Sequence, residues 1–296
     1  MGTENLYYRF KTKEFNINME RMLGIFAECL RGVKGTDALP LIKNAGFNCF
    51  ETGRYRRESV GELIKVGKEL GLVCDAIHAP FIFDDAYCND MWKDGDKYLK
   101  MYNSYMETID SASEFGIKHI VVHFMGNLKS PLICDKGLER FDDVVAYAKK
   151  KGVIIAFENL IRLGAITVAA DRYEGNENVG FCYDFGHAHC YSGYVYASDL
   201  DLVDILQDRI VTTHVHDNEG FMRDFKGELD FHRIPFDGNL DYEKVIKKMD
   251  KYGYRGALIL EVTNGRYPDM PHDEFLSMCY ERLKRISDYS SLNFDN

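Results

Sequence analysis

The sequence of 296 residues lacks the features that would cross-link it or place it in a membrane. None of its eight cysteines forms a CxxC pair, and most lie in apolar runs, where a free thiol packs as a small hydrophobic side chain. A chain of this length can build a full core, so we expect no disulfide framework. No stretch approaches 18 consecutive apolar residues, so no membrane span is predicted. Residues 1–9 lack the apolar region of a signal peptide, and the cytoplasm is therefore the expected compartment.

The chain also lacks an excess of positive charge. Its formal net charge is −10. Binding to nucleic acid depends on clustered Lys and Arg, so nucleic acid is not an expected partner, although bound divalent cations would offset carboxylates in a site. The one tight basic cluster in a predicted loop is Arg54, Arg56 and Arg57. This cluster fits either a solvated surface or a site for an anionic group such as a phosphate or a carboxylate.

What the sequence does contain is a regular alternation of apolar strands and helices. Apolar runs predict eight strands, at residues 22–29, 48–51, 73–81, 119–124, 153–159, 178–184, 210–218 and 257–263. Helical patterns follow them at 36–45, 59–70, 96–115, 137–151, 164–173, 199–207, 241–252 and 273–288. No GxGxxG follows the first strand, so a dinucleotide-binding sheet lacks its fingerprint. The pattern predicts an α/β fold, a (βα)₈ TIM barrel with eight parallel strands, as a single domain over residues 1–296 with a lead-in segment at 1–20.

Polar side chains follow these apolar runs at the points where the strands are predicted to end. The active site of a (βα)₈ barrel lies at the C-terminal ends of its strands. The residues found there are His78, His123, Glu158, Asp184, His187, His214 and Glu261, and the loop after the seventh strand adds Asp230 and His232. Gly186, between Asp184 and His187, is expected to allow a sharp turn.

Carboxylates and histidines in this number favour a metal site. Each residue alone also fits a structural role, as a core histidine or as a paired carboxylate. Together, however, the four carboxylates would repel one another in a buried site that held no cation. Five histidines mixed with four carboxylates form a suitable ligand set for Zn²⁺ or Mn²⁺. The sequence therefore predicts a divalent metal ion as cofactor.

The motifs that carry these residues resemble those of the xylose isomerase-like TIM-barrel superfamily. They are Phe157-Glu158-Asn159, Asp184-x-x-His187, His214-x-x-Asp217, Asp230-x-His232 and Glu261. The superfamily includes sugar isomerases and epimerases and the endonuclease IV type of AP endonuclease, and the resemblance covers residues 22 to about 287. It implies one central metal ion held by Glu158, Asp184, His214 and Glu261. The endonuclease IV branch implies further ligands, and up to three ions, at His78, His123, His187, Asp230 and His232.

Two loops depart from the endonuclease IV branch. After His123 the chain reads Phe-Met-Gly, where that branch has a His-Pro-Gly turn, and the loop after His78 lacks the Tyr and Asn of that branch. The first hypothesis is therefore a sugar or sugar phosphate isomerase or epimerase that acts on a small-molecule carbohydrate. The alternatives are a zinc phosphodiesterase that acts on abasic DNA and a barrel that binds metal and sugar without catalysis. A homo-oligomer is left open.

The first hypothesis assigns proton transfer to Glu158 and Glu261, which would flank a metal-stabilised enediolate. Both are placed at the end of an apolar strand and are followed by a polar turn. Further residues are expected to bind the substrate, namely Arg54, Trp92, Asn159 and His216. Aromatic residues of the long loops, Tyr87, Trp92, Phe221 and Phe236, fit either stacking on a sugar or anchoring of the loops.

Overall fold

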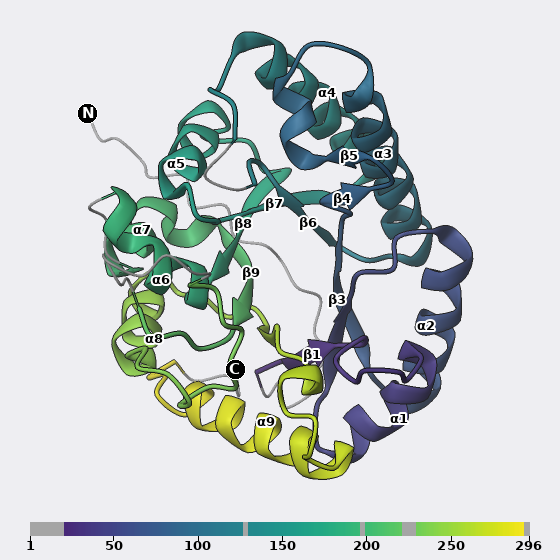
Figure 1. Cartoon of the computed structure of the whole chain (residues 1–296), viewed down its shortest axis with the longest axis vertical. Helices are drawn as coiled ribbons and strands as arrows, with labels where there is room; N and C mark the ends of the chain where they lie inside the picture. The colour runs from purple at the N-terminus through teal and green to yellow at the C-terminus, as the bar shows by residue number, and fades with distance from the viewer. Residues whose placement is uncertain (1–20, 127–129, 196–198, 221–228, 293–296) are drawn as a thin grey trace, which may run out of the picture.

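The computed structural model describes residues 21–126, 130–195, 199–220 and 229–292. Within these ranges a closed barrel of parallel strands lies at the centre, and helices surround it (Figure 1). The strands follow one another around the barrel in the order β1-β10-β9-β8-β7-β6-β3-β2. The predicted α/β barrel with eight parallel strands is confirmed. The predicted lead-in segment at 1–20 and Phe221 lie outside the described residues.

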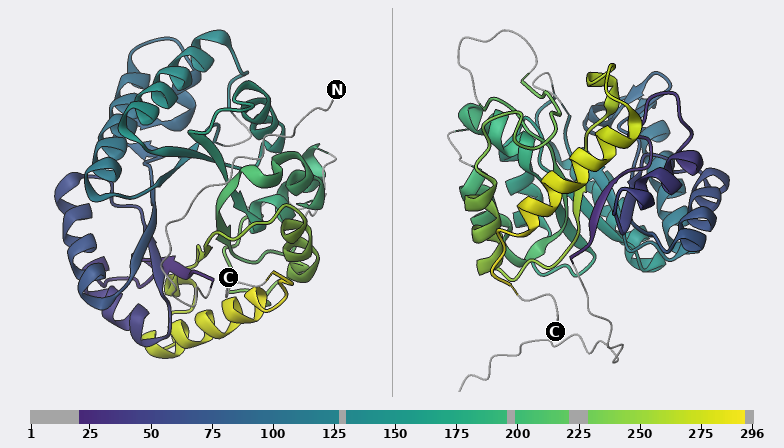
Figure 2. Two further views of the ribbon diagram at one scale, coloured as in Figure 1. Left: turned by 180° about the vertical axis from the view of Figure 1, so that it is seen from behind. Right: turned by 90° about the horizontal axis from the view of Figure 1, so that it is seen from below.

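The barrel strands are short and almost entirely buried, because helices cover their outer faces and side chains fill the interior. Figure 2 shows the helices around the barrel strands from behind and from below. The strands are β1 (Leu23–Phe26), β2 (Cys49–Thr52), β3 (Val73–His78), β6 (His119–His123), β7 (Ile154–Glu158), β8 (Val179–Asp184), β9 (Ile210–Val215) and β10 (Leu258–Leu260).

The helices begin and end close to the predicted positions, except for one that the sequence did not predict. They are α1 (Gly35–Asn44), α2 (Arg57–Leu70), α3 (Lys97–Phe115), α4 (Asp135–Lys151), α5 (Leu163–Arg172), α6 (Phe185–Val195), α7 (Asp199–Leu206), α8 (Tyr242–Lys251) and α9 (His272–Ser287). Short 3₁₀ turns are η1 (Cys88–Trp92), η2 (Gln207–Arg209) and η3 (Asn264–Arg266). Gly71, Gly116 and Gly152 end α2, α3 and α4 with positive φ, which explains why the helices stop there.

Two parts of the chain differ from the sequence-based expectation. The third strand ends at His78, not at Phe81, and a small antiparallel hairpin of β4 (Ile82–Phe83) and β5 (Ala86–Tyr87) follows it. Asp84 has a φ of 53° in the turn of this hairpin, a conformation that Asp tolerates better than most residues. Helix α6 was not predicted, because Gly186, two residues after Asp184, suggested a turn.

The interior of the barrel becomes polar towards the C-terminal ends of its strands. A layer of small apolar side chains, Ala76, Val121, Ala156 and Cys182, is fully buried inside the barrel. Two residues further along the same strands stand His78, His123, Glu158 and Asp184, which are also buried. Since side chains alternate along a strand, these polar residues point into the same interior space. No helix in the described part of the chain is long and apolar enough to cross a bilayer.

Candidate metal centre

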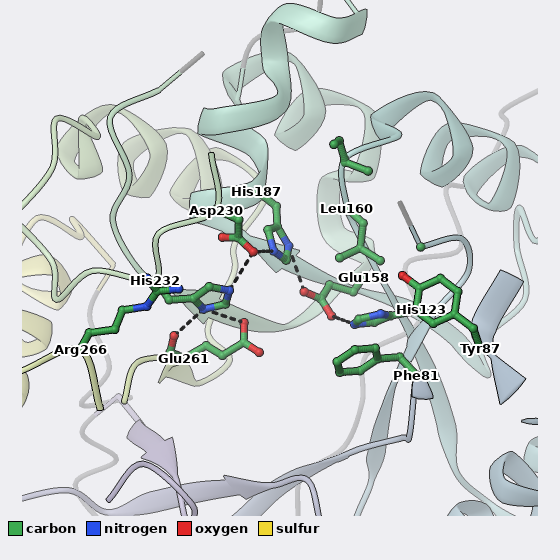
Figure 3. Close-up of a pocket in the computed structure, with 12 residues that line it drawn as sticks. Phe81, Tyr87, His123, Glu158, Leu160, His187, Asp230, His232, Glu261 and Arg266 are labelled. Atoms are coloured by element: carbon green, nitrogen blue, oxygen red, sulfur yellow. Dashed lines mark hydrogen bonds and ion pairs between the residues drawn. The ribbon is translucent and has the colours of Figure 1, made fainter. Parts of the chain in front are cut away.

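The C-terminal ends of the barrel strands open into a cavity of about 430 Å³ (Figure 3). The cavity brings together side chains from loops that are far apart in the chain. Its lining consists of Phe81, Tyr87, His123, Gly126, Glu158, Leu160, Ile161, His187, Asp230, His232, Glu261 and Arg266. A cavity of this volume falls in the range of small-molecule sites.

The central ligand group consists of Glu158, Asp184, His214 and Glu261, each of which places one ligand atom within 4.8 Å of the others. The Nδ1 atom of His214 lies 3.4 Å from Glu158 Oε1 and 3.5 Å from Glu261 Oε2. The same nitrogen lies 3.8 Å from Asp184 Oδ2. Three neighbouring strands, β7, β8 and β9, and the residue that follows β10 supply the group, so closure of the barrel brings it together.

The donor atoms of this group fit a divalent cation. Glu158 Oε1, His214 Nδ1 and Glu261 Oε2 are buried and form no hydrogen bond within the described ranges. Buried polar atoms normally have a partner, so three such atoms that converge on one point indicate a ligand between them. A divalent ion would satisfy all three and would balance the buried carboxylates.

The charged side chains in and around the central group shift one another's pKa values. Burial by itself would raise the pKa of Glu158, but the charges of His214 and His123 hold it well below its usual range. Burial would likewise lower the pKa of His214, but the carboxylates of Glu51, Glu261 and Glu158 raise it well above its usual range. A metal ion that binds at Nδ1 of His214 therefore has to displace a proton.

A second ligand group lies beside the first and consists of His187, His216, Asp230 and His232. Asp230 Oδ2 is 3.0 Å from His187 Nε2 and 2.8 Å from His232 Nε2. The ring of His216 stacks on that of His232 at a centroid distance of 4.0 Å. His216 was predicted to bind substrate. It is fully buried, its Nε2 lies 3.0 Å from Asp184 Oδ1, and it does not line the cavity.

Glu158 connects the central group to a third one, which consists of His78, His123 and Glu158. Its Oε2 atom lies 3.3 Å from His78 Nε2 and 3.0 Å from His123 Nε2, whereas its Oε1 faces His214. All nine predicted ligands thus lie in three adjoining groups. That they bind metal remains a prediction.

Asn159 and Gly186 position the second half of the site. Asn159 was predicted to contact substrate, but it is fully buried and exchanges two hydrogen bonds of 2.9 and 2.8 Å with the backbone of Asp184. Gly186 lies in the first turn of α6 and its φ is not positive. A Cβ at this position would lie 2.0 Å from His216 Cε1. The glycine therefore allows the close approach of His216, and the sharp turn inferred from the sequence was wrong.

Asp217 fixes the loop that carries Asp230 and His232. Its Oδ2 accepts a 2.8 Å hydrogen bond from Phe236 N, and its backbone pairs with Arg233 in an isolated antiparallel bridge. His232 lies next to this bridge with a φ of 42°, and its Nδ1 is 2.8 Å from the carbonyl oxygen of Glu261. The loop thus folds back over the barrel and delivers both ligands to the second group.

Two residues that were predicted to bind substrate lie elsewhere. Trp92 is only 3% exposed, donates a 2.8 Å hydrogen bond to Phe124 O and packs against Phe141, so no face of its ring is open to a sugar. Arg54 points to the surface, where its Nε lies 3.5 Å from Glu28 Oε1 in a separate hollow. Loop membership alone does not indicate where a side chain points, and the part of these two residues in substrate binding remains a prediction.

Two residues of the site were missed. Glu51 is the penultimate residue of β2, is fully buried, and places its Oε1 3.1 Å from His214 Nε2. The same pattern of an apolar strand that ends in a carboxylate was present in the sequence at this position. Arg266, in η3, is the only Lys or Arg among the described residues that line the cavity. Nothing in the sequence marked it, since its role depends on where the last loop folds.

The chain belongs to the xylose isomerase-like TIM-barrel family, since the model of that family matches residues 39–279. The resemblance inferred from the motifs is thereby confirmed. An uncharacterized protein of Sinorhizobium fredii, y4fM, is 30% identical over 172 residues, which make up 54% of this chain and 51% of that protein. The chain spans about half the length of the curated relatives it matches.

Several solved structures share the fold. The D-allulose 3-epimerase of Methylomonas sp. in complex with D-allulose aligns with a TM-score of 0.66 at 13% identity, over 92% of this chain and 99% of that one. The 3-keto-D-glucoside 4-epimerase YcjR of E. coli aligns with a TM-score of 0.65 at 17% identity, over 91% of this chain and 100% of that one. At such low identity these similarities establish the fold alone.

Proposed function

We propose that this protein is a divalent-metal-dependent isomerase or epimerase of sugars or sugar phosphates, with Glu158 and Glu261 as its acid–base pair. The observation that carries the proposal is that both carboxylates converge on His214 Nδ1, at 3.4 and 3.5 Å, within the central ligand group. The volume of the cavity and the epimerases among the structural neighbours also support it. When bound there, a divalent ion would polarise a sugar carbonyl and acidify the adjacent C–H bond.

The two carboxylates are not equivalent. Glu261 lines the cavity with a side chain that is 24% exposed, so it can reach a substrate carbon and is the stronger candidate for the base. Glu158 is almost fully buried, and its Oε2 contacts His78 and His123. A proton accepted at Oε2 would therefore be shared with these histidines. This arrangement suits the group that returns the proton to the substrate.

Other residues shape the cavity. Arg266 is the one Lys or Arg described in the lining, and Tyr87 and Phe81 supply aromatic surface, so a carbohydrate would contact these side chains instead of Arg54 and Trp92. Metal dependence with one central ion, a single domain over residues 1–296, a cytoplasmic location and a homo-oligomer are parts of the same proposal.

The test is turnover of a panel of ketoses and ketose phosphates by the metal-loaded protein in deuterated water, followed by proton NMR. We expect the product to carry solvent deuterium at the carbon that is inverted or reduced, because the carboxylate exchanges the proton with solvent before a proton is returned to that carbon. Conversion without deuterium uptake would indicate a hydride shift and would exclude both glutamates as the base. Absence of any conversion across the panel would contradict the proposal.

A zinc phosphodiesterase that acts on abasic DNA is the second candidate, and one observation favours it. Asp230 and His232 fold back onto His187, so the second and third ligand groups adjoin the central one, as multi-metal hydrolysis requires. The net charge of −10 opposes it, as does a described cavity lining that contains one Arg and no Lys, because gripping a DNA backbone needs clustered Lys and Arg. Cleavage of an oligonucleotide with one abasic site, together with inactivity on sugars, would decide for this candidate.

A further inference from the structure

Glu51 and His214 form a buried pair inside the barrel. They come from β2 and β9, which are separated by β1 and β10 in the barrel. Glu51 Oε1 lies 3.1 Å from His214 Nε2, and both side chains are fully buried. Glu51 belongs to none of the three ligand groups, so the pair is an addition to them.

The contact fixes which nitrogen of His214 faces the central group. With Nε2 held at Glu51, the ring presents Nδ1 to Glu158 Oε1 and Glu261 Oε2. The ring of Phe26 packs edge-on against the ring of His214 at a centroid distance of 5.5 Å, and the ring of His78 stacks on it at a centroid distance of 5.7 Å. Rotation of the ring would break the contact with Glu51 and place a carbon atom among the carboxylates.

We propose that Glu51 is the positioning residue of the central metal centre. It accepts the Nε2–H hydrogen bond of His214 and so holds the neutral tautomer whose Nδ1 lone pair faces the ion. A carboxylate that bonds the distal nitrogen of a metal-binding histidine orients the ring and increases its basicity. The inference rests on the metal dependence of the proposed function and is independent of the reaction catalysed.

The competing explanation is that removal of any buried charge from the barrel would weaken metal binding. Asp75 offers a matched control for this explanation. Asp75 is also a buried carboxylate of the barrel, on the neighbouring strand β3, but its Oδ2 bonds Thr212 Oγ1 at 2.7 Å. Its carboxylate hydrogen-bonds Thr212 and not His214, on which its charge acts only at longer range. A loss that follows from buried charge alone would appear in Asp75→Asn as well.

The experiment compares the affinity for Zn²⁺ of the unaltered protein, Glu51→Gln, Glu51→Ala and Asp75→Asn by competition with a chromophoric chelator. We expect roughly 10-fold weaker binding at the central site for Glu51→Gln, up to about 100-fold for Glu51→Ala, and no change for Asp75→Asn. Equal affinities in all four proteins, or equal losses in the Glu51 and Asp75 variants, would overturn the proposal. No substrate is needed, so failure here is distinct from failure of the proposed sugar chemistry.

A second measurement does not depend on whether the variants fold. In the Zn²⁺-loaded unaltered protein, long-range ¹H–¹⁵N correlation of the histidine rings distinguishes the two tautomers. We expect His214 to carry its proton on Nε2 and to bind metal through Nδ1. A proton on Nδ1 with metal on Nε2 would overturn the proposal, because Glu51 could then not accept the hydrogen bond.

Discussion

His187 and Asp230 lie 43 positions apart in the chain, yet His187 Nε2 is only 3.0 Å from Asp230 Oδ2. This contact joins the first turn of α6 to the loop after β9 and creates the second ligand group. The loop folds back far enough to do so because Asp217 bonds its distal part. The barrel thus contains a compact set of ligand groups instead of one isolated site.

Removal of Asp230 should separate the second group from the first. In Asp230→Ala, His187 and His232 lose the carboxylate that both contact, so any ion bound by this group should be lost while the central ion remains. The measurement is the ratio of metal to protein after dialysis, by elemental analysis. An unchanged ratio would mean that the second group holds no ion.

Asp184→Ala should have the complementary effect. Asp184 is fully buried in the central group, and solvent does not replace a lost ligand at equal affinity, so the central ion should be lost. The same elemental analysis measures this, with circular dichroism to confirm that the barrel is folded. Full metal content in this variant would exclude Asp184 as a ligand.

Glu261→Gln should remove the base while it preserves the shape of the site. We expect turnover of the substrate identified in the ketose panel to fall by roughly 10²–10⁴-fold, the usual contribution of general acid–base catalysis. Deuterium uptake from solvent should slow to the same extent. Glu28→Gln is the matched control, since Glu28 lies in an adjoining hollow and bonds Thr52, not the central group. Equal activity of the two variants would contradict the assignment.

Gly186→Ala should destabilise the protein because a Cβ would lie 2.0 Å from the ring of His216. We expect a loss of roughly 1–3 kcal/mol in the free energy of unfolding, as in other overpacked interiors. Gly164→Ala is the control. Apart from its sequence neighbours and the backbone of α5, no atom lies within 4 Å of a Cβ built at Gly164. This substitution should therefore be neutral or should stabilise the folded protein by about 0.4–1 kcal/mol. Urea denaturation measures both variants.

The metal-free protein should lose stability as the pH rises from about 6.5 to about 9. Burial of His232 opposes its ionisation, but Glu261 and Asp230 raise its pKa to about 9. A histidine whose pKa is higher in the folded than in the unfolded protein stabilises the fold when it is protonated. This stabilisation is complete at a pH below the unfolded-state pKa, and it is lost as the pH rises through the folded-state pKa. The contribution is at most about 3 kcal/mol and is reduced by solvent, since the side chain is 23% exposed. Thermal unfolding of His232→Gln should show a flatter pH dependence; an equal slope would contradict this assignment.

The sequence alone predicted the barrel and most of the candidate ligands. Parallel strands buried on both faces need continuous apolar runs, and the side chain at the C-terminal end of each run must project from the same end of a barrel. His78, Glu158 and His214 were therefore identifiable from their positions at the ends of such runs. This logic also applied to Glu51, which was overlooked although it obeys the same rule.

Only the tertiary structure decided how side chains pair and which loop residues reach the cavity. Strand-end residues have one direction available, whereas a loop side chain can point to solvent, core or cavity, and its direction depends on distant packing. Trp92 entered the core, Arg54 turned to Glu28, and Arg266 reached the cavity for this reason. The need for glycine at position 186 likewise follows from His216, which lies 30 residues further along the chain but next to it in the folded barrel.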